Sequence, residues 1–316
     1  MSNQKPDPHA GARRAVLAAF FGNLGVAISK LVAFLFTGSS AMLAEFYHSV
    51  ADTVNQAFLL LGLKLGQRPA DETHPFGYGR ERYFWAFIVA LSIFTLGAVL
   101  SVIEGVSKLL EPHDIKNAGL SYVALGIAAL FEAYALRVAW KEFQHWRADH
   151  PGPLLKGLRR SKAPTILIVL FEDSAALLGI LVAAAGITLT LVTGNPIWDG
   201  LASVVIGVLL GVVAVFLGLR TRGLLLGEGA TEEDSRRIRE AVEGTEGVTE
   251  LLELLTLHIG PEDLLVNLSV HFADELRTGD LERVVDEIER RIRDGVPVAT
   301  RIFIEAESIK GVVSAS

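Results

Sequence analysis

The feature that constrains this chain most is a series of six apolar segments, each long enough to cross a lipid bilayer. A spanning helix needs about 20 predominantly apolar residues, because the hydrocarbon core is about 30 Å thick and an α-helix rises about 1.5 Å per residue. The segments lie at about 15–36, 40–66, 83–109, 119–145, 165–191 and 197–220 of the 316 residues. The sequence therefore predicts an α-helical integral membrane protein with six transmembrane helices.

The distribution of basic residues predicts the orientation of these helices. Lysine and arginine gather before the first segment, after the second and after the fourth: Lys5, Arg13, Arg14, Arg68, Arg80, Arg82, Lys156, Arg159, Arg160 and Lys162. The alternate connections contribute only Lys116. The positive-inside rule then places both termini in the cytoplasm. The absence of a cleavage site behind the first apolar run and the compact loops favour a retained helix and a prokaryotic cytoplasmic (inner) membrane.

The last part of the chain has the pattern of a small soluble domain. Thr231 and Asp234 resemble a capping box, residues 248–259 and 264–272 alternate like strands, and a last strand is expected near 300–305. Between the strands, Asp280 is expected to cap a helix with one apolar stripe. The order predicts an αββαβ (ferredoxin/metallochaperone-like) α+β domain. The predicted division is a tail at 1–14, a transmembrane domain at 15–220, a cytoplasmic domain at 221–310 and a tail at 311–316.

Two of the apolar segments carry acidic residues and a histidine. Glu45, His48, Asp52 and Asn55 are spaced by 3, 4 and 3 residues, so they share one helix face. Glu172 and Asp173 adjoin each other in the fifth segment. Each carboxylate at the bilayer centre costs about 2.5–3.5 kcal/mol on insertion scales, and a bound cation is the simplest compensation. The chain has no cysteine, so His, Asp and Glu would be the ligands, a set that suits Zn²⁺, Mn²⁺ or Fe²⁺.

Structural alternatives stand beside this interpretation. The polar face of the second segment could be a hydrogen-bonded cluster, and Glu172 could pair with a basic or hydroxyl group instead of a metal ion. Acidic residues near helix ends, Glu104 and Glu132, are expected to pack or orient neighbours. Lys30 could snorkel to the surface or act as a counter-charge for an empty metal site.

The connection after the second segment offers a further pair of ligand types. Asp71 and His74 lie three residues apart in the polar stretch 69–85, where a turn could bring both to one metal ion. A surface aspartate and a surface histidine explain the same spacing. Gly77 and Gly79 allow a tight path back to the third segment.

The stretches AEFYHSVADTVNQ and RPADETHPFGYGRERY together closely resemble the cation diffusion facilitator family of metal–proton antiporters. The resemblance implies six spans, cytoplasmic termini, an αββαβ cytoplasmic domain and a homodimer. It implies His48, Asp52 and Asp173 as ligands of an intramembrane site, whose fourth ligand position falls on Val169 instead of histidine. Glu172, Asn55 or water could take that place.

The resemblance is weaker at the accessory sites. The loop site would use Asp71 and His74, but its third ligand falls on Tyr78, so this site is expected to be weakened or lost. Glu305 and Glu307 stand where some members have a histidine and an aspartate, and His258 and His271 lie nearby without clear alignment. The fifth segment has Val169 where the family has histidine but keeps Glu172 and Asp173. In this respect the chain resembles a divergent branch that includes the mitochondrial zinc transporter of animals.

These observations together predict export of cytoplasmic Zn²⁺ driven by inward protons, with His48 exchanging a proton for metal near neutral pH. Transport of Mn²⁺ or Fe²⁺ through the same fold is one alternative, and a non-transporting metal sensor or interaction protein is another. The expected partners are the lipid bilayer, a divalent metal ion and a second copy of the chain. An enzyme is not expected, because no nucleophile–base constellation or nucleotide loop is present, and neither is a nucleic-acid partner.

Overall fold

The computed structural model describes residues 8–115, 117–149 and 164–307. The chain divides into two compact units. The first unit contains Met1–Lys64 and Tyr83–Arg222, and the second contains Leu65–Arg82 and Gly223–Ser316. The connection after the second predicted span therefore groups with the C-terminal domain and not with the helices that it joins.

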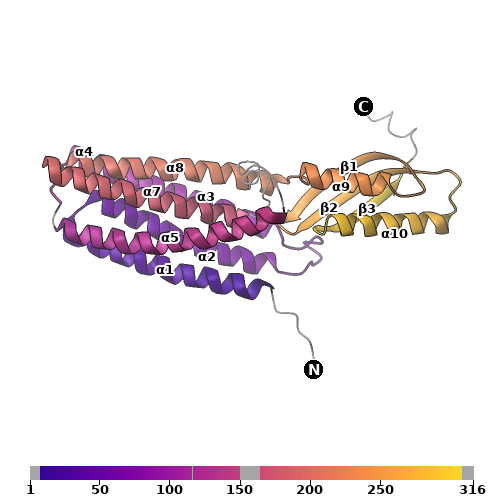
Figure 1. Cartoon of the computed structure of the whole chain (residues 1–316), viewed down its shortest axis with the longest axis horizontal. Coiled ribbons are helices and arrows are strands. Elements are labelled where there is room, and N and C mark those ends of the chain that lie inside the picture. The colour runs from indigo at the N-terminus through magenta and orange to yellow at the C-terminus, as the bar shows by residue number, and fades with distance from the viewer. Residues whose placement is uncertain (1–7, 116, 150–163, 308–316) are drawn as a thin grey trace, which may run out of the picture. The chain divides into compact units, whose positions relative to one another are not determined.

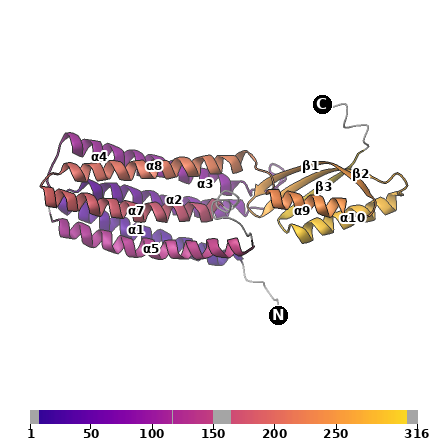
Figure 2. The ribbon, with the colours of Figure 1, turned by 45° about the horizontal axis from the view of Figure 1, so that its top comes forward.

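The first unit is a bundle of long helices that run side by side, as both views show (Figures 1 and 2). Its elements are α1 (Pro8–Thr37), α2 (Ser40–Gly66), α3 (Glu81–Ser92), η1 (Ile93–Val99), α4 (Leu100–Leu110), α5 (Ala118–Asp149), α7 (Pro164–Thr193) and α8 (Ile197–Leu226). The segments α3, η1 and α4 follow one another without a break, so they form one crossing. Helix α5 packs against both α1 and α7.

Five stretches of the described residues are long and apolar enough to cross a membrane: Phe20–Thr37, Glu81–Leu110, Ala118–Lys141, Ile168–Thr193 and Ile197–Leu226. Helix α2 has 27 residues, which is also long enough, but it carries Glu45, Asp52 and Lys64. The predicted fold class, a membrane helix bundle with a small α+β domain, is confirmed. Helix α2, the second predicted span, is more polar than those five stretches because it carries the candidate ligands.

Two features of the bundle differ from the sequence-based expectation. Helix α1 begins at Pro8 instead of about 15, because backbone hydrogen bonds continue beyond the apolar run that marks the membrane part. The third crossing contains a π-helical stretch at Ile93–Val99, where Gly97 faces Leu210 and Ala51. Lys5, Lys116, Lys156, Arg159, Arg160 and Lys162 lie outside the described residues, so the orientation stays a prediction.

Buried polar contacts fix the start of α2. The carboxylate of Asp199 accepts hydrogen bonds from Ser39 Oγ at 2.6 Å and from the backbone N–H of Ser40 at 2.7 Å. Lys108 Nζ lies 3.9 Å from the same carboxylate, and Ser40 Oγ donates to Glu104 at 2.8 Å. Glu104 therefore orients a neighbouring helix, as expected. Because orphan N–H groups at a helix start need acceptors, Asp199 ties α8 to the beginning of α2.

The second unit contains a three-stranded sheet with two helices on one face. Its elements are α9 (Glu232–Glu243), β1 (Val248–Gly260), β2 (Asp263–Phe272), α10 (Thr278–Gly295) and β3 (Ala299–Ala306). The strand order is β1-β2-β3, antiparallel between β1 and β2 and parallel between β2 and β3. Ile238, Leu268, Ile288 and Ile292 meet in its apolar core. The predicted αββαβ order is confirmed.

The two helix starts of this unit differ from each other. Thr231 caps α9 as predicted, because its hydroxyl accepts from the backbone N–H of Asp234 at 3.1 Å. The prediction that Asp280 caps α10 is wrong. The helix begins earlier, at Thr278, with Arg277 in the N-cap position, so Asp280 lies in the first turn and pairs with Arg283. An acid in the first turn still interacts favourably with the helix dipole.

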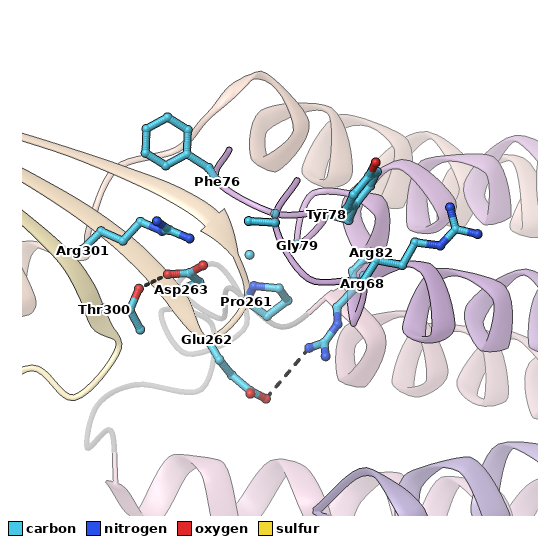
Figure 3. A pocket seen from close by; sticks show the side chains of 14 residues that line it. Arg68, Phe76, Tyr78, Gly79, Arg82, Pro261, Glu262, Asp263, Thr300 and Arg301 are labelled. Atoms are coloured by element: carbon cyan, nitrogen blue, oxygen red, sulfur yellow. Dashed lines mark hydrogen bonds and ion pairs between the residues drawn. The ribbon is translucent and has the colours of Figure 1, made fainter. Parts of the chain in front are cut away.

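The segment Leu65–Arg82 packs against the β1–β2 end of the sheet. A Cβ added at Gly79 would lie 2.6 Å from the carbonyl oxygen of Ile259, so this close approach requires glycine. Beside the contact lies a hollow of about 500 Å³ (Figure 3), where Arg82 faces Glu262 at 4.0 Å and Thr300 donates to Asp263. Burial raises the pKa of Asp263. The loop is thus part of a packed domain surface.

Candidate metal centre

The polar face of α2 points into the bundle. Glu45, His48, Asp52 and Asn55 are all at most 2% exposed, as their spacing predicts for one face. Nδ1 of His48 lies 3.6 Å from Oδ1 of Asp52, which is too long for a hydrogen bond. The two side chains are therefore neighbours whose polar atoms remain available.

Helix α7 contributes two buried carboxylates to the same region. Glu172 and Asp173 are 3% and 8% exposed, and Asn55 Nδ2 donates to Glu172 Oε1 at 2.7 Å. The carboxyl groups of Asp52 and Glu172 interact across the helix interface. Glu172 thus pairs with an amide and an acid, whereas a basic or hydroxyl partner was expected. The interaction brings α2 and α7 together at Asp52, Asn55 and Glu172.

Small residues on α7 allow this close approach. Ala175 and Ala176 are buried, and a Cβ added at Gly179 would lie only 2.4 Å from Oε1 of Glu45. The side chain of Glu45 therefore occupies the space above Gly179. A methyl group at this position would force the carboxylate of Glu45 to shift.

A third helix adds a carboxylate that the sequence did not assign to the site. Glu132 is 5% exposed and lies near the middle of α5, so its interpretation as a packing group near a helix end is wrong. Its charge interacts with those of Asp52, Glu172 and Asp173. Sequence periodicity gives the helix, but only the packing of α5 against α7 shows that Glu132 faces this region.

Several polar atoms in this part of the described structure have no hydrogen-bond partner. Besides Oε1 of Glu45 and Oδ1 of Asn55, they include both ring nitrogens of His48, Oδ1 of Asp52, Oε2 of Glu172 and Oδ2 of Asp173. Buried polar atoms without partners are costly, and those that persist call for a physical reason. Nitrogen and carboxylate oxygen donors fit a divalent transition-metal ion. Within the described ranges no three of these His, Asp and Glu side chains lie close enough together to hold a metal ion, so binding would require them to converge.

Models of two protein domains match the chain. The cation efflux transmembrane domain matches residues 16–226, and the cation efflux protein cytoplasmic domain matches residues 230–309. The chain belongs to the cation efflux family. It is a multi-pass integral membrane protein, and the resemblance to cation diffusion facilitators is confirmed.

Curated relatives of this cation efflux protein include proteins from plants, animals and bacteria. Metal tolerance protein C4 of Arabidopsis thaliana is 33% identical over 270 residues, which cover 85% of this chain and 59% of the relative. The mitochondrial proton-coupled zinc antiporter SLC30A9 of Homo sapiens is 31% identical over 285 residues, covering 88% and 50%. The magnetosome protein MamB of Paramagnetospirillum magneticum is 27% identical over 293 residues, covering 90% and 91%. The chain thus spans only 50–59% of the length of the plant and human relatives. Its similarity to the mitochondrial zinc antiporter confirms the expected branch of the family.

The loop pair Asp71 and His74 is engaged with Tyr78. The Tyr78 hydroxyl donates to Asp71 Oδ2 at 2.7 Å, and the backbone N–H of His74 donates to Oδ1 at 2.7 Å. These hydrogen bonds lower the pKa of Asp71 to about 2, and the same bond to Asp71 raises the pKa of Tyr78. The residue that departs from the family's ligand pattern therefore hydrogen-bonds the carboxylate that a loop metal ion would use.

The candidate metal ligands of the C-terminal domain differ in their exposure and in their hydrogen-bond partners. Glu305 is an exposed residue of β3, whereas His258 is buried in β1 with Nδ1 3.3 Å from the carbonyl oxygen of Gly260. Nδ1 of His271 lies 3.1 Å from the carbonyl oxygen of Glu307. In the described part of this domain, these side chains form no group of three or more ligands.

Proposed function

We propose that this cation efflux protein carries a divalent metal ion, Zn²⁺ by preference, across the membrane through His48, Asp52, Glu172 and Asp173. The observation that supports this most strongly is the set of buried, unpartnered nitrogen and oxygen atoms on α2 and α7. A metal ion on which these side chains converge would supply the missing partners. Glu132 adds a further acid to the same buried region.

The coupled ion is the proton. Imidazole and carboxylate groups bind metal only when they are deprotonated, so protons that arrive at the site displace the ion. His48 and the buried carboxylates are the groups of the site that take up these protons. Alternating access to this site would export metal from the cytoplasm in exchange for inward protons. The name of the human relative, a proton-coupled zinc antiporter, agrees with this proposal.

Transport of Mn²⁺ or Fe²⁺ is the second candidate. Among the described residues, the region contains the carboxylates of Asp52, Glu132, Glu172 and Asp173 but only one imidazole, because Val169 stands where the family pattern has histidine. Oxygen-rich sites favour harder cations than sites with several imidazoles. The relative rates for the three ions therefore report on the ligand set.

The loop and the C-terminal domain take supporting roles in this proposal. Asp71 and His74 stay candidate accessory ligands, in competition with the Tyr78 hydrogen bond. A homodimer through the cytoplasmic domain is supported by the open face of the sheet, where Leu255 and Phe303 are half exposed and pair with the same residue of β2, Asn267. We place the protein in a prokaryotic cytoplasmic membrane with both termini in the cytoplasm.

The test is ion flux into proteoliposomes that contain the full chain. Uptake of Zn²⁺, Mn²⁺ and Fe²⁺ is measured with and without an opposing pH gradient. We expect Zn²⁺ uptake that the gradient accelerates, and loss of uptake in His48→Ala and Asp52→Asn. The control is His113→Ala, since His113 is an exposed histidine outside the bundle core.

Each outcome bears on one part of the proposal. Faster Mn²⁺ or Fe²⁺ uptake than Zn²⁺ uptake would replace the first candidate ion by the second. Metal binding without flux would favour a sensor over a transporter. Undiminished zinc flux in both His48→Ala and Asp52→Asn would remove these residues from the transport site.

A further inference from the structure

A fully buried lysine lies beside the candidate site. Lys30 of α1 has no exposed surface, and its Nζ donates to Glu45 Oε2 at 2.8 Å and to Ser49 Oγ at 2.8 Å. It therefore does not snorkel to the membrane surface. A buried ammonium group is costly unless it is paired and hydrogen-bonded. Its retention inside the bundle calls for a role.

The two partners of Lys30 lie on either side of His48 in the sequence of α2. Glu45 lies one turn before His48, and Ser49 follows His48 directly. The positive charge of Lys30 also interacts with His48, Asp52 and Glu132. The ligands on α2 and the acid on α5 thus all experience the field of one lysine.

The position of this charge is held from two sides. Oε2 of Glu45 accepts from Lys30, while the other carboxylate oxygen fills the space above Gly179 of α7. Because Glu45 is fixed between α1 and α7, Lys30 stays at a set distance from the ligands. Without Glu45, the ammonium group would be drawn toward the remaining acids, Asp52 and Glu132.

We propose that Lys30 and Glu45 form a tethered counter-charge that sets the affinity of the site for metal ions. Lys30 opposes the positive charge of the incoming ion and so weakens binding enough for release. Glu45 confines Lys30 and prevents it from competing for the ligands. This inference rests on the proposed metal site but assigns both residues to positioning, not to ligation.

The proposal predicts changes of opposite sign in the two single variants. In Lys30→Gln the site loses the opposing charge, so we expect the Kd for Zn²⁺ to fall roughly ten- to hundredfold, the range typical of coupled charges. In Glu45→Gln the released Lys30 competes with the metal, so the Kd should rise. Because Glu45 acts through Lys30, the double variant should keep a Kd below the wild-type value, near that of Lys30→Gln.

The measurement is Zn²⁺ titration of the purified full chain in detergent, together with KM and kcat for flux. Lys30→Gln should lower both constants, since tighter binding slows release. Lys30→Arg keeps the charge and should bind as the wild type does. The matched control is Lys108→Gln, which removes another fully buried lysine that faces Asp199. Asp199 accepts a hydrogen bond from the backbone N–H of Ser40, which lies eight residues before His48 on α2, or about 12 Å along the axis.

The outcomes separate this inference from the proposed function. Wild-type protein that binds no Zn²⁺, Mn²⁺ or Fe²⁺ would overturn the metal site itself. Wild-type binding with Kd shifts of the same sign in Lys30→Gln and Glu45→Gln, or with no shift in either, would overturn the counter-charge alone. If Glu45→Gln does not fold, the comparison of Lys30→Gln with Lys30→Arg and Lys108→Gln decides. Equal affinities in these three variants would contradict the proposal.

Discussion

Substitution of Gly179 by alanine tests the packing that brings α2 and α7 together. The added Cβ would lie 2.4 Å from Oε1 of Glu45, whereas ordinary van der Waals contact begins at 3.4 Å, so about 1 Å of separation (3.4 − 2.4) has to be gained. Glu45 cannot give way freely, because its other oxygen holds Lys30 at 2.8 Å. Either the helices move apart or the hydrogen bond to Lys30 is lost.

The expected loss of stability follows from three contributions. Overpacking costs about 1–3 kcal/mol, and a lost hydrogen bond to a charged group costs about 1.5–3 kcal/mol. Replacement of glycine by alanine inside a helix returns about 1 kcal/mol. Because either the overpacking or the lost hydrogen bond applies, and not both, the net expectation for Gly179→Ala is a loss of up to about 2 kcal/mol in the free energy of unfolding.

A matched control exists on α8. A Cβ added at Gly211 would lie 3.7 Å from the Cβ of Ala98, which is ordinary contact. Gly211→Ala should therefore be neutral, or stabilising by up to about 1 kcal/mol through helix propensity. Denaturant unfolding of both variants in the same detergent provides the comparison. If Gly179→Ala proves as stable as Gly211→Ala, Glu45 does not fill the space above Gly179 and the α2–α7 interface is arranged differently.

Three further predictions concern other parts of the chain. Asp199→Ala should lower the stability of the bundle by about 3–5 kcal/mol in thermal unfolding, because it leaves Lys108 buried without its partner; an unchanged melting temperature would contradict this. Gly79→Ala should destabilise the second unit by about 1–3 kcal/mol, measured by hydrogen exchange in β1. The Asp71 hydrogen bonds stabilise the loop above the ordinary pKa of aspartate and are lost as pH falls toward about 2. Tyr78→Phe should raise the pKa of Asp71, which can be measured by NMR of the carboxyl carbon. An unchanged pKa would exclude the hydrogen bond between Tyr78 and Asp71.

The sequence predicts the fold well because membrane burial and strand alternation leave periodic signals. Apolar runs locate the crossings, and the alternation of Val266, Leu268 and Val270 locates the central strand, whose inward residues are fully buried. The spacing of His48 and Asp52 likewise places both on one buried face. Each of these inferences needs only the geometry of a single helix or strand.

Features that depend on contacts between elements could not be predicted in this way. Glu132 joins the acids of α7 only because α5 packs with that face inward, and Lys30 meets Glu45 only through the packing of α1 against α2. The association of Leu65–Arg82 with the C-terminal domain depends on the contact of Gly79 with Ile259. The sequence predicts which face of a helix is polar, but it does not predict which neighbouring helix packs against that face.

The charges of the buried region connect these contacts to transport. Glu45 is matched by Lys30, and Asn55 donates one hydrogen bond to Glu172. Asp52, Glu132, Glu172 and Asp173 then form an acidic group, and Lys30 interacts with Asp52 and Glu132 at longer range. Carboxylates cannot remain charged together in a low-dielectric interior without compensation, so protons or a divalent ion must neutralise them. Because the same atoms accept either, occupancy by one excludes the other, and the proposed exchange of metal for protons rests on this charge balance.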